Sequence, residues 1–538
     1  MSEFLLYYKR PDPTTWVYLS SFLTIGLYFV FHRFWSFRNL DLVLLILLAP
    51  GLLMVHEGRR RLLREMESVE LREEATVADV DPDVELPPGG GVSPGVAPPE
   101  DSGTDATDSK REDRIDPPPA ENAAGAEVVT DPPSVADETK IPLVAEPNAL
   151  DERLESTAED PDSLESAEEV SAKKLQRRGF VFLFVIELFI LVRLLCDPLM
   201  NRRPLLDPNL AVGGLYFISI SLFIFMMANV ATSTPRMRVW QGPELGPGYA
   251  LMHRLPTITT RPVSAALGGE EPATEDELDA SNRSWTVLAK VLAISAHLAI
   301  IAGVVLIGNR HFGNLRSGVG CALLYLLVPY TAQMTGRVDH ALPAALLLWA
   351  VLCYRRPSIA GVFIGLAAGL VYYPLFLLPL WCSFYWQRGV RRFALSVVVT
   401  LALLVVLLSL GGTESLFEHF RRMFGLFLPT EEPRGIWVVG WDPQWRLPVI
   451  VAFGILSFLF AAWPSPKNLG TLISCSATVM VAVQFWHGYG GGLYVAWFLP
   501  LLLLTIFRPN LEDRVATKVV SRSRSGSGIG SNSSPVLS

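Results

Sequence analysis

A succession of apolar segments limits the fold of this chain more than any other feature. Half of its 538 residues are hydrophobic. A run of about 18 or more apolar residues can cross a hydrocarbon core of roughly 30 Å as a helix, and shorter runs suit helices buried among others. The sequence predicts an all-α fold, a polytopic transmembrane helical bundle of about 12–13 membrane segments. The candidate segments are 16–32, 40–55, 179–197, 212–232, 285–307, 317–334, 341–354, 359–386, 391–410, 447–464, 470–485 and 491–507.

The segment 359–386 is too long for a single span. Its roughly 28 residues would form a helix of about 42 Å at 1.5 Å per residue, which exceeds a hydrocarbon core of roughly 30 Å. Tyr372-Tyr373-Pro374 lies at its middle, and proline interrupts a helix. Arginines flank both ends, and basic residues favour the cytoplasmic side. We expect a broken helical V that returns to the side where it began.

The polar sequence separates the chain into regions. The net charge of −8 comes from one acidic linker, which lacks the apolar side chains needed to offset its ordering entropy. We expect this linker to be disordered, and we expect no nucleic-acid partner. The predicted regions are two N-terminal transmembrane helices (1–56), an acidic Pro/Gly-rich linker with basic ends (57–178), a membrane domain (179–507) with extramembrane loops 233–284 and 411–446, and a disordered basic Ser/Gly tail (508–538).

Basic residues in the C-terminal half agree on one topology. If Arg355-Arg356 is cytoplasmic, the alternation of spans places Arg388, Lys467 and the basic tail on the same side, as the positive-inside rule requires. Toward the N-terminus, the same alternation places the basic ends of the linker outside, against the rule. One span between 179 and 307 is therefore re-entrant or miscounted. The turns expected on the outer face are 336–340, 372–374, 411–446 and 486–492.

These outer turns carry the candidate functional side chains. Asp339 lies beside Arg337 and His340 at the start of a span, and the other candidates are Tyr372 and Tyr373 at the break of the V, His487 before a glycine run, and Asp442. Each has a structural alternative. An aspartate beside an arginine is also typical of a helix start, paired tyrosines at a proline break also serve packing, and a loop histidine can bind a backbone carbonyl.

Three motifs in this region occur in a fixed order. Gly336-x-x-Asp339 precedes an apolar span, Ala360-Gly361-x-x-x-Gly365-Leu-Ala-Ala follows the basic turn, and Tyr373-Pro374-Leu-x-x-Leu-Pro begins at the break. Together they resemble the integral-membrane glycosyltransferases of the C-type superfamily that use polyprenyl-phosphate sugars. The chain is most similar to glycosyltransferase family 87, over about residues 240–507. It departs from such families in having no lysine before Tyr372-Tyr373-Pro374.

The resemblance implies a hexosyl- or pentosyltransferase of the bacterial plasma membrane, with a polyprenyl-phosphate-linked sugar as donor and no cofactor; a requirement for a divalent metal stays open. The acceptor would be a glycan, a lipid or a protein on the outer face. Such transfer needs a carboxylate for the acceptor proton and cationic groups for the leaving phosphate. Asp339 is then a catalytic candidate, and Arg337, His340, Tyr372, Tyr373 and His487 are substrate-binding candidates. The family's acid lies early in the first large outer loop, which selects Asp197 as the second catalytic candidate, with Asp207 and Glu244 as alternatives.

A second class of function remains open. The chain could be a non-catalytic membrane protein, either a transporter or flippase of lipid-linked intermediates or an assembly factor. Transporters tend to have broken helices at corresponding positions in two halves. The sequence has one broken segment and no internal repeat, which favours the transferase.

Overall fold

The computed structural model describes ten ranges of the chain. They are 13–78, 167–200, 206–232, 235–236, 257–258, 280–410, 436–439, 441–465, 467–488 and 491–509. Most of the linker, most of the loops 233–284 and 411–446, and the tail from residue 510 lie outside the described residues. The expected disorder of the linker and of the tail therefore stays a prediction.

Helices dominate the described residues, and the predicted all-α bundle is confirmed. The elements are α2 (Pro13–Tyr28), η1 (Phe31–Arg33), α3 (Phe37–Ala78), α5 (Ala167–Cys196), η3 (Asp197–Leu199), α6 (Val212–Thr232), α8 (Ala280–Arg310), α9 (Leu315–Leu327), α10 (Pro329–Gln333), α11 (Val338–Leu352), α12 (Pro357–Leu370), η7 (Tyr373–Leu377), α13 (Leu378–Phe384), α14 (Val390–Leu410), α16 (Ile436–Val439), η8 (Pro443–Trp445), α17 (Arg446–Ala462), α18 (Leu469–Gln484), η9 (Val495–Trp497) and α19 (Leu499–Phe507). Two short strands, β1 (Pro235–Arg236) and β2 (Thr257–Ile258), pair antiparallel. Every predicted segment coincides with one or more of these helices.

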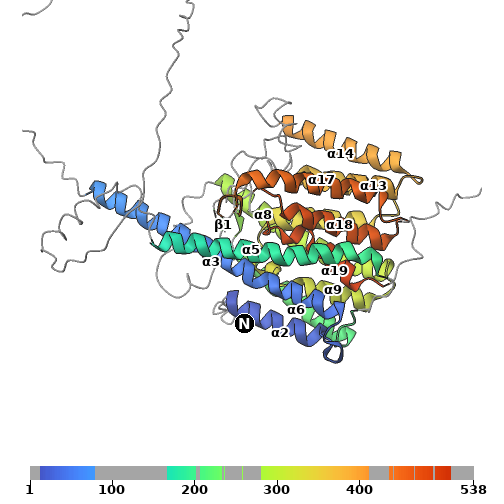
Figure 1. The fold of residues 1–538 in the computed structure, drawn as a ribbon, viewed down its shortest axis with the longest axis horizontal. Coiled ribbons are helices and arrows are strands. Elements are labelled where there is room, and N and C mark those ends of the chain that lie inside the picture. The colour runs from blue at the N-terminus through green and yellow to red at the C-terminus, as the bar shows by residue number, and fades with distance from the viewer. Residues whose placement is uncertain are drawn as a thin grey trace, which may run out of the picture. The chain divides into compact units, whose positions relative to one another are not determined.

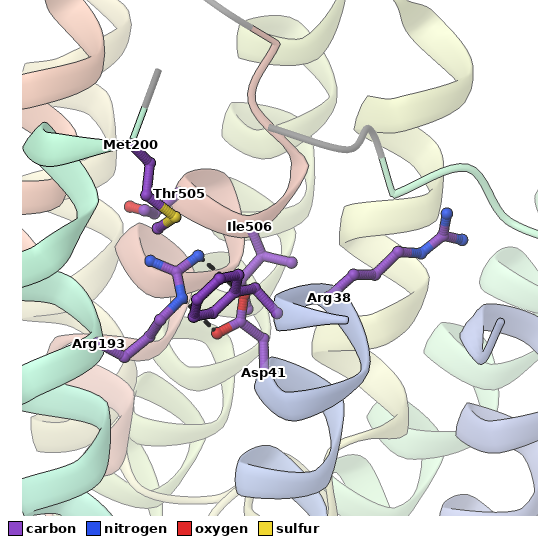
Figure 2. A pocket seen from close by; sticks show the side chains of 7 residues that line it. Arg38, Asp41, Arg193, Met200, Thr505 and Ile506 are labelled. Atoms are coloured by element: carbon purple, nitrogen blue, oxygen red, sulfur yellow. Dashed lines mark hydrogen bonds and ion pairs between the residues drawn. The ribbon is translucent and has the colours of Figure 1, made fainter. Parts of the chain in front are cut away.

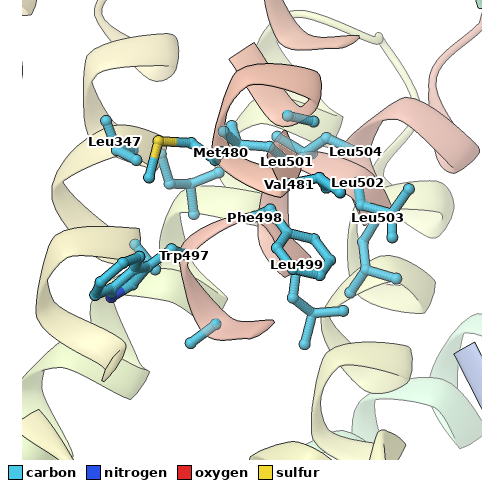
Figure 3. Packing of buried hydrophobic residues seen from close by; sticks show 14 of the residues in the cluster. Leu347, Met480, Val481, Trp497, Phe498, Leu499, Leu501, Leu502, Leu503 and Leu504 are labelled. Carbon is cyan, nitrogen blue, oxygen red and sulfur yellow. The ribbon is translucent and has the colours of Figure 1, made fainter. Parts of the chain in front are cut away.

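Long helices surround short ones. Among the described residues, six helices are long and apolar enough to cross a membrane, and they run roughly parallel to one another (Figure 1). They expose large apolar side chains, such as Leu395 on α14 and Phe458 on α17. The short helix α18 is buried along its whole length. In Figure 3, its Met480 packs between Leu347 of α11 and the leucines of α19. The chain is thus an integral membrane protein whose outer helices contact lipid.

The predicted V is confirmed. α12 ends at Leu370, the chain turns through Tyr372 and η7, and α13 leads back. The hydroxyl of Tyr385, just past α13, donates a hydrogen bond of 2.5 Å to the carbonyl of Tyr354, just before α12. Because the residues at the two ends of the V touch, the segment returns to the end of the bundle where it began. Tyr372 and Tyr373 therefore lie at the opposite end.

The helices α3 and α5 extend into the segment 57–178 that the sequence assigns to the linker, so both ends of this segment are helical. α3 continues to Ala78, and α5 begins at Ala167. Ion pairs one helical turn apart, Arg61 with Glu57 and Lys173 with Glu169, support these polar turns.

Glycines allow α3 and α5 to approach closely. A Cβ on Gly58 of α3 would lie 2.8 Å from the backbone nitrogen of Gln176 and 2.9 Å from the carbonyl oxygen of Ala172. Both atoms belong to the backbone of α5 and cannot rotate away. Small residues of this kind let membrane helices pack backbone to backbone.

We expect Gly58→Ala to destabilise the protein, because the added methyl group forces α3 away from α5. The matched control is Gly454→Ala in α17, where a Cβ would meet no atom within 4 Å. Thermal unfolding in detergent should give a midpoint lowered by several degrees for the first variant and unchanged or raised for the second. Equal midpoints would contradict the close helix contact.

Candidate functional site

Asp339 lies in the first turn of α11 and is held by its neighbour. Arg337 donates two hydrogen bonds to the carboxylate, Nε to Oδ1 at 2.9 Å and Nη2 to Oδ2 at 2.8 Å. Both side chains are largely buried. The negative charge also faces the positive end of the α11 dipole. This geometry fixes the carboxylate at the end of a membrane helix, where Arg337 balances its charge.

His340 connects Asp339 to an aromatic cluster. Its Nε2 lies 3.7 Å from Oδ2 of Asp339, and its Nδ1 is hydrogen-bonded to the hydroxyl of Tyr330. The ring stacks on Tyr494 at a centroid distance of 4.7 Å. Trp497, three residues further along the chain, donates from Nε1 to the Asp339 carbonyl at 3.1 Å. The start of α11 is thereby joined to the segment that leads into α19.

The two tyrosines of the V face the same cluster. Tyr372 and Tyr373 lie side by side with ring centroids 4.2 Å apart. The Tyr373 ring contacts Trp486 at 5.1 Å, His487 at 5.1 Å and Trp497 at 5.5 Å. The rings of Tyr372 and Tyr373 thus form one cluster with those of Trp486, His487 and Trp497. We call this cluster the aromatic wall.

The loop after α18 is held in place by side chains. The Gln484 side-chain oxygen accepts hydrogen bonds from the backbone nitrogens of Gly492 and Tyr494, each at 3.2 Å. Arg446, at the start of α17, donates from Nε to the carbonyl of Trp486 at 2.8 Å. A Cβ on Gly488 would lie 2.6 Å from Nη2 of Arg446, so only glycine lets the guanidinium approach the loop this closely.

Arginines at this end of the bundle act on two buried side chains of the cluster. Burial, and next the Arg446 guanidinium, lower the pKa of His487 well below its usual value, so this ring is neutral at physiological pH. Burial and then the Asp339 carboxylate raise the pKa of Tyr494, while Arg337 and Arg59 act in the opposite direction. Arg59 belongs to α3, so this helix also reaches the site.

The structure therefore brings six of the predicted site residues together: Arg337, Asp339, His340, Tyr372, Tyr373 and His487. Sequence reasoning did not select Arg446, Tyr494, Trp497 or Arg59 as site residues. Tyr494 and Trp497 do lie in an aromatic segment after a glycine run, which was a usable signal. Asp442 is exposed and accepts a hydrogen bond of 2.9 Å from the backbone nitrogen of Gln444, which makes it a cap of η8.

Asp197 lies at the other end of the bundle. Its carboxylate is fully buried and paired with Arg193, at 3.3 Å, and with Arg508. Arg508 in turn lies against Gly470 at the start of α18, whereas His487 follows the end of that helix. At 1.5 Å per residue, α18 separates the two ends by about 24 Å. Asp197 is thus not brought together with Asp339.

The Asp197 carboxylate belongs to a buried charge network. Arg193 of α5 also binds Asp41 of α3, with Nε 2.8 Å from Oδ1 and Nη2 3.0 Å from Oδ2 (Figure 2). The positive charges of Arg193 and Arg508 balance the negative charges of Asp41 and Asp197. The cavity beside them, of about 20 Å³, has room for one water but not for a sugar. Its lining residues are Phe37, Arg38, Asp41, Arg193, Met200, Thr505 and Ile506.

The other acids considered fall elsewhere. Asp207 is 56% exposed and lies 3.4 Å from Nε of Arg316, and Glu244 lies outside the described residues. Within the described ranges, no three His, Cys, Asp or Glu side chains gather as metal ligands would. Comparisons with protein-family models, with curated proteins and with solved structures find no match to this chain.

Replacing Asp197 with Asn should destabilise the fold, because it leaves Arg193 and Arg508 buried with too little negative charge. Breaking such a pair costs about 3–5 kcal/mol. The matched variant Asp207→Asn removes an exposed pair worth about 0–1 kcal/mol. Thermal unfolding of the purified proteins should show a clearly lower midpoint for Asp197→Asn than for Asp207→Asn. An Asp197→Asn protein as stable as the wild type would show that the network is dispensable.

Proposed function

We propose that this protein is an integral membrane glycosyltransferase that moves a sugar from a polyprenyl-phosphate carrier to an acceptor. The observation that carries the proposal is the cluster at one end of the bundle. There a fixed carboxylate, Asp339, adjoins His340 and the aromatic wall, with the Arg446 guanidinium behind that wall. These are the groups that glycosyl transfer from a lipid phosphate requires.

Each group has a place in the proposed reaction. The acceptor hydroxyl oxygen forms a bond to the anomeric carbon of the sugar while the bond from that carbon to the phosphate oxygen breaks. Asp339 takes the hydroxyl proton, and the leaving phosphate keeps the electron pair. Arg446 and Arg59 supply positive charge for the phosphate. The rings of Tyr373 and Trp486 offer faces on which a sugar can stack.

The location of the cluster suits a lipid-linked donor. It lies at the ends of α11 and α18, so the carrier can keep its polyprenyl chain among the outer helices. Trp445, at the start of α17, is 68% exposed, and tryptophan favours the membrane boundary. We further propose that this end faces the outside of a bacterial plasma membrane and that the acceptor is a glycan, a lipid or a protein.

Asp339→Asn keeps the size of the side chain and removes the charge. We expect sugar incorporation to fall by about a hundredfold or more, as for loss of an acid–base group, while the amount of folded protein in the membrane stays normal. The matched control is Asp442→Asn, because Asn can also cap a helix and Asp442 lies outside the cluster. If the Asp339 variant transfers sugar normally, or if the folded protein itself is lost, Asp339 has a structural role.

A further inference from the structure

Glu187 is the one fully buried carboxyl among the described residues for which the fold provides no partner. It lies in the apolar part of α5 and is fully buried. Neither of its carboxyl oxygens has a hydrogen bond or an ion pair with a residue that the structure describes. Ionisable side chains within membrane segments are expensive and usually mark functional sites. Asp197, on the same stretch of chain, shows how this fold treats a structural carboxylate, since two arginines bind it.

The Glu187 carboxyl faces the loop that forms the candidate site. A Cβ on Gly492 would lie 3.6 Å from Oε2 of Glu187, and Gly492 has a φ of 87°, which favours glycine. Two residues further along the chain, Tyr494 packs against His340 and His487. Glu187 thus lies against the same loop as the Asp339 cluster, on the side of α5.

Aromatic side chains surround the same face of α5. Phe184, one turn before Glu187, stacks on Trp441 with centroids 5.8 Å apart and planes inclined by 24°. Trp441 adjoins Trp437 at 5.9 Å, and α16, which carries Trp437, lies against α5. Trp437 is buried, and its indole N–H has no acceptor in the described part of the chain. A second unpartnered polar group therefore lies in the same region.

These groups have the chemistry of a sugar site. A carboxyl oxygen accepts hydrogen bonds from hydroxyls, an indole N–H donates one, and an aromatic face covers the apolar side of a sugar ring. A metal ion would need further ligands, and none gather here among the described residues. A buried polar group without a partner is costly until a ligand supplies one.

We propose that Glu187, with Trp437 and Trp441, forms a hydroxyl-binding subsite for the saccharide part of the acceptor. The assignment of this sugar to the acceptor rests on the proposed function. It places the saccharide body of the acceptor on the α5 side of the segment 491–494, with its reacting hydroxyl and the donor on the side of Asp339.

The first experiment measures stability with the full chain in phosphatidylcholine nanodiscs. Glu187→Met replaces the carboxyl with an apolar side chain of similar length and removes an unsatisfied polar group. We expect its unfolding midpoint to rise by about 2 °C or more. A structural carboxyl would give a lower midpoint instead, and that result would overturn the proposal. Glu169→Gln, in the polar first turn of the same helix, serves as the control.

The second experiment measures ligand binding in the same nanodiscs. Hexyl glycosides of glucose, galactose, mannose and arabinose serve as probes. At least one should raise the midpoint of the wild type and of Glu169→Gln but not that of Glu187→Met. Trp437→Phe, which keeps a ring and removes the N–H, should weaken the effect. If no glycoside stabilises the wild type more than Glu187→Met, the subsite is refuted.

The third experiment separates this proposal from the proposed function. In a transfer assay, Glu187→Met should raise the KM for the acceptor at least tenfold and leave the KM for the polyprenyl-phosphate sugar unchanged. Unaltered transfer by this variant would overturn the subsite while the transferase stands. A wild type that binds glycosides through Glu187 but transfers no sugar would refute the transferase, and a saccharide site would remain.

Discussion

Charges buried between membrane helices must be neutralised inside the protein, and the four-residue network around Arg193 meets this condition. Asp41, Arg193, Asp197 and Arg508 come from α3, from α5, from η3 and from the residue after α19. Together they join α3 and α5 to the end of α19. Water does not screen such groups, so removing one leaves its partner exposed to a low dielectric. The network therefore fixes α3 and α5 against the core.

This attachment matters because α3 and α5 also reach the opposite end of the bundle. Arg59 of α3 and Glu187 of α5 lie near the loop after α18. At that end the polar groups are arranged differently. Asp339 is bound by one arginine, and Glu187 has no partner among the described residues. One end of the bundle satisfies its charges within the fold, and at the other end we propose that a substrate satisfies the remaining polar groups.

Much of this architecture was predictable from local sequence. Hydropathy located every span, since a bilayer admits only helices or closed barrels. The length of segment 359–386 and its central Tyr372-Tyr373-Pro374 predicted the broken helical V. The alternation of basic turns grouped Asp339, the tyrosines and His487 at one end. In contrast, the contacts of Asp197 and Arg508 join residues 311 positions apart, and no local pattern encodes such a pairing. Arg446 and Glu187 were not predicted as site residues for the same reason. Their roles depend on which residues, distant in sequence, pack against them.

The most direct test of the central claim follows the chemical fate of the donor. Purified protein in liposomes would receive a polyprenyl-phosphate sugar labelled separately in lipid and sugar, together with a membrane extract as acceptor. The account predicts that the labels separate: the sugar moves to an acceptor, and polyprenyl phosphate accumulates in equal amount. Intact donor that crosses to the other leaflet with both labels still joined would contradict it and would identify a transporter.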